Sequence, residues 1–205
     1  MPKQTFFNLP EVKQQILIDS LKEEFSRVPL HEASIANIVH RAQIPRGSFY
    51  QYFTDKEDAY YFLLEQLTKK NQKKIILYLN QFNGDIFETF IQIFEDMLRD
   101  FQAKENRDFF RNTFLNMNYK IESKFIPDFY EEDYLSEISS LINIQMLNLS
   151  DEKHLFHVLK IIMAVTFQNT VQNFVCKVPK EEAIRIYMLE MDLLKKGLYR
   201  AEYKD

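Results

Sequence analysis

The sequence predicts an all-α protein, and three observations lead to this fold class. The 205 residues include three glycines and six prolines, so few positions favour turns or breaks. Apolar residues recur three and four positions apart, which is the period of an amphipathic helix. Leu, Ile, Phe, Lys and Glu are abundant, which is typical of a helical protein. The hydrophobic content of 46% is also enough to bury a substantial core.

The first helix is expected to run from about residue 9 to Arg27, with Pro29 just beyond its end. Asn8 and Glu11 have the spacing of a capping box, in which Asn8 is the N-cap and Glu11 bonds back to it. Apolar residues lie on one face of this helix: Val12, Ile16, Leu17, Leu21 and Phe25.

Two short helices joined by a tight turn are predicted between residues 34 and 53. The first has an apolar face made of Ile35, Ile38, Val39 and Ala42. Pro45 suits the first turn of the second helix, where its missing N–H is no loss. Phe49 and Phe53 turn inward, which leaves an outer surface of Arg46, Ser48, Tyr50, Gln51 and Tyr52. This arrangement is typical of a helix-turn-helix whose second helix enters a DNA major groove.

The remaining chain is predicted to be helical as well. One long helix should run over residues 55–82 and end at Asn83-Gly84. Five further helices are expected over residues 85–103, 106–119, 135–147, 150–176 and 179–197. We therefore expect a three-helix helix-turn-helix domain over residues 1–54 and a helical domain over residues 55–205, with 55–82 as the linking helix.

Residues of about 9 to 66 resemble the DNA-binding domain of the TetR family of bacterial transcriptional regulators. Three runs carry the resemblance: Ile-Ala-x-Ile-Val-x-x-Ala, Ile-Pro-Arg-Gly-Ser-Phe-Tyr-x-Tyr-Phe and Asp-Lys-Glu-Asp. Where the family often has Gly in the turn, this chain has Gln43, which would cost roughly 1 kcal/mol relative to Gly if φ is positive there.

The resemblance implies a ligand-responsive repressor that binds an inverted-repeat operator in double-stranded DNA as a homodimer. A small hydrophobic or aromatic effector would release it, and the C-terminal domain would bind that effector and form the dimer. The alternatives are a helical enzyme, a protein-interaction adaptor, or a DNA-binding activator without small-molecule control.

The candidate DNA-binding residues lie in and around the second short helix. Arg46 can read guanine N7 and O6 through its planar fork, although a phosphate contact is about equally plausible. Gln51 could bridge adenine N6 and N7 or be solvated, and Lys56 would hold a phosphate at the start of the long helix. Gly47 would let the helix approach the groove closely, or only relieve crowding. The full candidate set is Ser34, Arg46, Gly47, Ser48, Tyr50, Gln51 and Lys56.

An effector pocket is predicted from the many aromatic residues between positions 87 and 130. Its candidate residues are Phe90, Phe94, Phe110, Phe114, Phe125, Gln168 and Gln172. Aromatic residues at helical spacing are more often simply core. The two amides could instead bond across a dimer interface or lie on a solvated helix edge. The last two helices would pair with their copies in a four-helix bundle through Leu155, Val158, Leu159, Ile162, Ile186, Leu189 and Leu193.

Other function classes find little support in the sequence. No cofactor is expected, and there is no Gly-rich phosphate loop and no repeated Glu-x-x-His pattern of a metal-carboxylate enzyme. Asp151, His154 and His157 lack the further ligands that zinc needs. Cys176 cannot form an intramolecular disulfide, and no apolar run is long enough to span a bilayer, so a cytoplasmic protein is expected. The net charge of −4 divides into +2 for residues 1–80 and −6 for residues 81–205, which favours a site-specific DNA reader over a nonspecific coat.

Overall fold

The computed structural model describes residues 1–100, 104–125 and 132–198. Within these ranges the chain forms eleven α-helices, three short 3-10 helices and no strand, which confirms the all-α prediction. The chain forms two compact units. The boundary expected between residues 54 and 55 stays a prediction, and the compact units divide the chain at other positions, the first of them after Thr68.

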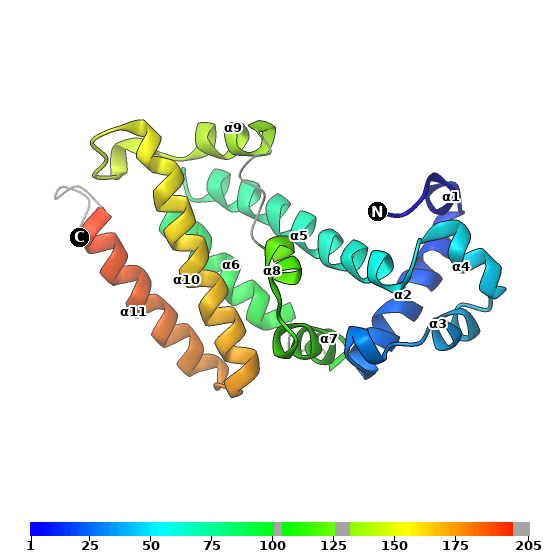
Figure 1. Cartoon of the computed structure of the whole chain (residues 1–205). Helices are drawn as coiled ribbons and strands as arrows, with labels where there is room; N and C mark the ends of the chain where they lie inside the picture. The colour runs from blue at the N-terminus through cyan, green and yellow to red at the C-terminus, as the bar shows by residue number, and fades with distance from the viewer. Residues whose placement is uncertain (101–103, 126–131, 199–205) are drawn as a thin grey trace. The chain divides into compact units, whose positions relative to one another are not determined.

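The first unit comprises Met1–Thr68 and Phe101–Phe125. Its helices, labelled in Figure 1, are α1 (Gln4–Phe7), α2 (Glu11–Arg27), α3 (Ile35–Arg41), α4 (Arg46–Tyr52), the first part of α5 (Lys56–Gln81), α7 (Lys104–Leu115) and α8 (Tyr119–Phe125). A 3-10 helix, η1 (Leu30–Glu32), separates α2 from α3. Within this unit α2 packs against both α3 and α7, and α1 packs against α4.

The second unit comprises Lys69–Asp100 and Ile126–Asp205. It contains the rest of α5, α6 (Ile86–Asp100), α9 (Glu132–Leu141), η2 (Ile144–Met146), η3 (Glu152–His154), α10 (Leu155–Cys176) and α11 (Lys180–Leu198). Helices α6, α10 and α11 pack against one another around an apolar core, and Figure 1 shows α10 and α11 side by side. The buried hydroxyl of Tyr187 on α11 bonds to Thr166 Oγ1 on α10 at 2.6 Å.

An ion-pair cluster joins α5 to α6 in the second unit. The carboxylate of Asp96 is buried and accepts hydrogen bonds from Lys74 Nζ at 2.9 Å and from the Tyr78 hydroxyl at 2.7 Å. Burial would raise the pKa of Asp96, but these hydrogen bonds and the Lys74 charge outweigh burial and lower it.

The elements differ from the sequence prediction at two places in the first unit. The prediction of Asn8 as N-cap of the first long helix is wrong. Asn8 is the C-cap of α1 with αR backbone angles, whereas an N-cap needs an extended backbone, and α2 starts after Pro10. The helix predicted over 106–119 ends earlier, because α7 stops at Leu115, and a separate helix, α8, starts at Tyr119. Asn118 starts the second by accepting the Ile121 backbone N–H at 3.0 Å.

The turn between α3 and α4 is a Schellman motif with a non-glycine residue at its left-handed position. Gln43 has φ +52°. The Gln43 N–H donates to the His40 carbonyl at 3.3 Å, and the Ile44 N–H donates to the Val39 carbonyl at 3.1 Å. These two bonds satisfy the last carbonyls of α3. The condition stated from the sequence, a positive φ at this position, is met, so the left-handed backbone costs Gln43 roughly 1 kcal/mol relative to glycine.

A buried carboxylate on α2 holds α3 in place. Glu24 is 0% exposed. It accepts hydrogen bonds from two guanidinium groups, from one side-chain amide and from the backbone N–H that precedes α3. The donors are Arg27 Nη2 at 2.7 Å, Arg41 Nη1 at 3.1 Å, Asn37 Nδ2 at 3.1 Å and Ser34 N at 2.9 Å.

These donors change the ionisation of Glu24. Burial by itself would raise the pKa of Glu24, but the hydrogen bonds from Arg27, Ser34 and Asn37, with the Arg27 charge, outweigh it and lower the pKa from 4.5 to about 2. The folded first unit therefore stabilises the ionised form of Glu24 relative to the unfolded chain.

Replacing Glu24 by glutamine is expected to lower the free energy of unfolding at pH 7 by about 3 kcal/mol, because a pKa depressed from 4.5 to about 2 corresponds to that much differential stabilisation. Since the folded pKa is the lower one, the stabilisation is present above pH 4.5 and is lost as the pH falls toward 2. Urea unfolding of wild type and Glu24→Gln should therefore converge over this range.

Glu23→Gln is the matched control, because Glu23 is 64% exposed and its ion pair with Arg41 lies at the surface. Its loss should change the free energy of unfolding by less than about 1 kcal/mol. An equal loss for both variants, or a Glu24→Gln effect that does not change with pH, would contradict the assignment.

Candidate nucleic-acid interface and effector pocket

Helix α4 is anchored by two phenylalanines and exposes its other side. Phe49 and Phe53 are both 0% exposed, and their ring centroids lie 5.6 Å apart. Arg46, Tyr50 and Gln51 are exposed on the same short helix. The inward and outward residues are therefore those that the helical spacing predicts, and the exposed side carries donors that suit base edges and phosphates.

Gly47 lies in the first turn of α4, where no other part of the chain crowds it. A Cβ built at this position would meet no atom within 4 Å. Relief of crowding within the molecule is therefore not the reason for a glycine at this position. Ser48, the next residue, is half-buried.

Two residues of the predicted DNA-binding set make contacts inside the unit. Lys56 Nζ donates to the carbonyls of His31 at 2.9 Å and Ala33 at 3.1 Å, so it holds the segment that leads into α3. Ser34 is the N-cap residue of α3, and its backbone N–H bonds to Glu24. An ammonium has three donors, so Lys56 retains one N–H beyond these two bonds.

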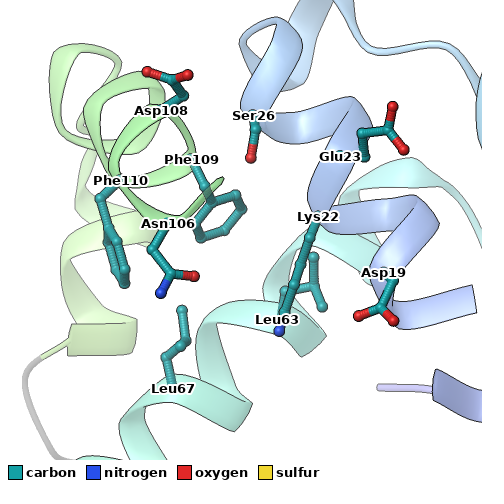
Figure 2. Close-up of a pocket in the computed structure, with 10 residues that line it drawn as sticks. All are labelled: Asp19, Lys22, Glu23, Ser26, Leu63, Leu67, Asn106, Asp108, Phe109 and Phe110. Atoms are coloured by element: carbon teal, nitrogen blue, oxygen red, sulfur yellow. The ribbon is translucent and has the colours of Figure 1, made fainter. Parts of the chain in front are cut away.

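A pocket of about 650 Å³ lies in the first unit between α2, α5 and α7 (Figure 2). The rings of Phe109 and Phe110 and the side chains of Leu63 and Leu67 give it an apolar wall. Its polar lining residues are Asp19, Lys22, Glu23, Ser26, Asn106 and Asp108. This combination of apolar wall and a few polar groups is typical of a small-molecule site.

The helices that line the pocket are also bonded to one another. Asn112 Nδ2 on α7 donates to the Phe25 and Ser26 carbonyls in the last turn of α2, at 3.1 and 2.9 Å. The Tyr60 hydroxyl on α5 donates to Thr113 Oγ1 on α7 at 2.8 Å, and burial raises the pKa of Tyr60 to about 12. Helix α2 thus forms a wall of the pocket and also carries Glu24, which holds α3.

The structure distributes the predicted effector residues over both units. Phe110 lines the pocket, and the ring of Phe114 stacks on the Phe110 ring with their centroids 5.9 Å apart. Phe90 and Phe94 lie in the core of the second unit, where the ring centroids of Phe94 and Tyr187 are 4.2 Å apart. Gln168 and Gln172 are exposed on α10, and the side chain of Phe125 lies outside the described residues.

The predicted dimer residues also divide into two groups. Leu155, Val158, Leu159 and Ile162 are at most 4% exposed and belong to the core of their own unit. Ile186 is half-buried, whereas Leu189 and Leu193 on α11 are 55% and 62% exposed. Other exposed apolar side chains on α10 and α11 are Ile161, Val175 and Met188.

Sequence reasoning missed several residues that build these sites. Glu24 reads as an ordinary surface carboxylate, although its position on the apolar side of α2, next to Phe25, was a usable signal. Asn112 gives no such signal. In the second unit, the hydroxyls of Thr89 and Tyr134 are buried and have no hydrogen-bond partner among the described residues.

Two properties of the described residues bear on other classes of function. No group of three or more His, Cys, Asp or Glu side chains in this part of the chain is placed to hold a metal ion. No helix in it has the length and apolarity that crossing a bilayer requires.

Comparisons with known proteins agree with the all-α fold and with the helix-turn-helix. The family model described as "Tetracyclin repressor-like, C-terminal domain" matches residues 85–198, and the model "Bacterial regulatory proteins, tetR family" matches residues 17–59. A comparison with curated protein sequences found no match.

Several solved structures share the fold. A TetR family transcriptional regulator from Chloroflexus aurantiacus is 24% identical, over 98% of this chain and 99% of that chain, with a TM-score of 0.50. The regulator FadR from Bacillus subtilis, solved with stearoyl-CoA, is 13% identical over 89% and 98%, with a TM-score of 0.62. SmeT, the repressor of the Stenotrophomonas maltophilia multidrug efflux pump SmeDEF, is 12% identical over 91% and 90%, with a TM-score of 0.62.

The matched family models cover the helix-turn-helix and more than half of the chain. The protein therefore belongs to the TetR family of DNA-binding transcriptional regulators, which are not enzymes.

Proposed function

We propose that the protein is a ligand-responsive transcriptional repressor that binds an inverted-repeat operator as a homodimer and is released by a small hydrophobic or aromatic effector. It acts in the cytoplasm, on bacterial DNA. The observation that carries this proposal is the exposed side of α4, fixed from within by Phe49 and Phe53. Repression, rather than activation, is the common mode of the family.

Arg46 is the main candidate for reading a base. It is the first residue of α4 and is exposed, so its guanidinium can reach guanine N7 and O6 when the N-terminal end of the helix enters the groove. The bare backbone at Gly47 supports a close approach, because no side chain separates this turn from the duplex. Tyr50 and Gln51 extend the same surface toward neighbouring bases or phosphates.

The exposed apolar side chains on α10 and α11 support the proposed dimer, in which two copies would pair through these helices. Met188, Leu189 and Leu193 are 48%, 55% and 62% exposed, which is unusual for neighbouring large apolar side chains on a free surface. Ile161 and Val175 on α10 are 45% and 46% exposed. Two copies joined here would present two α4 helices to an operator of two-fold symmetry.

The pocket between α2, α5 and α7 is the proposed effector site in the first unit. An apolar or aromatic ligand would pack on Phe109, Phe110, Leu63 and Leu67. Because α2 forms a wall of this pocket and also holds α3 through Glu24, a ligand that displaces α2 would move the helix-turn-helix. Ligand and operator would then weaken each other's binding by the same factor.

Replacing Arg46 by alanine is expected to weaken binding to the DNA upstream of the protein's own gene by about 5- to 150-fold, the worth of one good base contact. Fluorescence anisotropy with this DNA and with random DNA measures the effect. The control Lys73→Ala removes the same charge from an exposed position on α5 in the second unit. A wild type without preference for the upstream DNA would contradict the proposal, and an equal loss on both DNAs would make Arg46 a phosphate contact.

The double variant Leu189→Glu/Leu193→Glu is expected to dissociate the dimer, because four carboxylates would be placed in a desolvated interface. We expect the dimer dissociation constant, measured by sedimentation, to rise at least about 100-fold. Leu115→Glu, at a residue 53% exposed on α7 in the first unit, is the control. An unchanged dimer in the double variant would show that pairing uses another surface.

Occupation of the pocket can be followed with N-phenyl-1-naphthylamine, a neutral aromatic probe that fluoresces in apolar sites. Leu67→Phe fills the pocket without opening a cavity and should weaken probe binding about ten-fold, whereas Leu77→Phe, at a residue 59% exposed in the second unit, should not. Compounds that displace the probe should also release the upstream DNA. Equal probe binding by all three proteins, or displacement without release, would argue against this effector site.

A further inference from the structure

The C-terminal end of α4 leaves four backbone carbonyls without partners inside the helix, as any helix does. The carbonyl of Phe49 is satisfied by the next residue after the helix, because Phe53 N–H donates to it at 2.8 Å. The other three carbonyls belong to Tyr50, Gln51 and Tyr52. Their partners come from the N-terminal segment of the chain.

The segment Lys3–Thr5 supplies all three partners. Lys3 Nζ donates to the Tyr50 carbonyl at 2.8 Å, and the Lys3 backbone N–H donates to the Tyr52 carbonyl at 2.8 Å. The Thr5 hydroxyl donates to the Gln51 carbonyl. The Lys3 ammonium also places a positive charge at the negative end of the helix dipole.

Phe6 fixes this segment to the unit. Its side chain is 1% exposed, and its ring centroid lies 5.4 Å from that of Phe53 and 5.3 Å from that of Phe62. Figure 1 shows α1 next to α4, in agreement with the contacts between them. Lys3 and Thr5 are therefore held at the end of α4 by a buried aromatic residue one to three positions away.

A clamp at this end matters because α4 has only seven residues. Helices of this length do not persist by themselves, so their last turn depends on contacts from outside. The carbonyls bonded by Lys3 and Thr5 belong to Tyr50 and Gln51, whose side chains are exposed on the proposed reading surface. The clamp therefore acts on the backbone of residues that face the DNA.

We propose that the segment Lys3–Phe6 is a positioning clamp that fixes the last turn of α4 and so sets how well the protein distinguishes its operator from other DNA. The inference rests on the proposed function in one respect, that Tyr50 and Gln51 face bases in the complex. The segment precedes the residues matched by the family model, 17–59.

Thr5→Val is the decisive variant, because it removes one hydroxyl donor at an exposed position and changes neither charge nor volume appreciably. Loss of one hydrogen bond to the helix end should weaken binding to the upstream DNA about five-fold, and Thr5→Val combined with Lys3→Ala about twenty-fold. Binding of random DNA by Thr5→Val should stay within about two-fold of wild type. Hydrogen exchange should accelerate in the peptide covering residues 46–53.

Thr68→Val is the matched control, since it removes a hydroxyl that donates to the Leu64 carbonyl within α5. It should leave both the DNA preference and the exchange of residues 46–53 unchanged. Thermal melting followed by circular dichroism checks that every variant is folded.

Two results would overturn the proposal. The first is wild-type operator binding and wild-type exchange of α4 in Thr5→Val. The second is a loss confined to Lys3→Ala, equal on operator and random DNA, with the salt slope reduced by about 0.9, which identifies Lys3 as a phosphate contact. If wild type shows no preference for its upstream DNA, the proposed function fails, while accelerated exchange would still establish the clamp on α4.

Discussion

The ionised carboxylate of Glu24 is the interaction on which the helix-turn-helix depends. A fully buried charge is unfavourable unless several donors compensate for it, and here two guanidinium groups, an amide and a backbone N–H do so. These donors come from α2, from α3 and from the residue that precedes α3. The position of α3 is therefore fixed by hydrogen-bond geometry as well as by apolar packing, and α4 follows from it through the short turn at Gln43.

Helix α2 connects three parts of the first unit. Through Glu24 it holds α3, through its last carbonyls it accepts the Asn112 amide of α7, and with Lys22, Glu23 and Ser26 it lines the pocket. A small displacement of α2 would therefore change the helix-turn-helix and the pocket together. Packed helices have discrete arrangements rather than continuous ones, so such a displacement is suited to a two-state response.

Local patterns were sufficient to predict α3, the turn and α4, because their inward residues repeat at helical spacing and Pro45 marks the start of α4. The ends of α2 and α5 were also predictable from Pro29 and from Asn83-Gly84. Patterns were not sufficient for contacts between distant residues. Lys3 meets Tyr50 across 47 positions and Arg41 meets Glu24 across 17, and neither pair leaves a periodic signal. The same limit applies to Leu155, Val158, Leu159 and Ile162, since a helix with apolar residues on several faces does not reveal which face turns to its own core.

The empty space around Gly47 has a consequence for how this protein could change. Glycine inside a helix is less stable than alanine by about 1 kcal/mol, and nothing in the chain would obstruct a methyl group at this position. Selection for folding would therefore replace Gly47 readily. The fold itself does not require a glycine here, and under the proposed function the constraint comes from the DNA duplex, which would leave no room for a side chain.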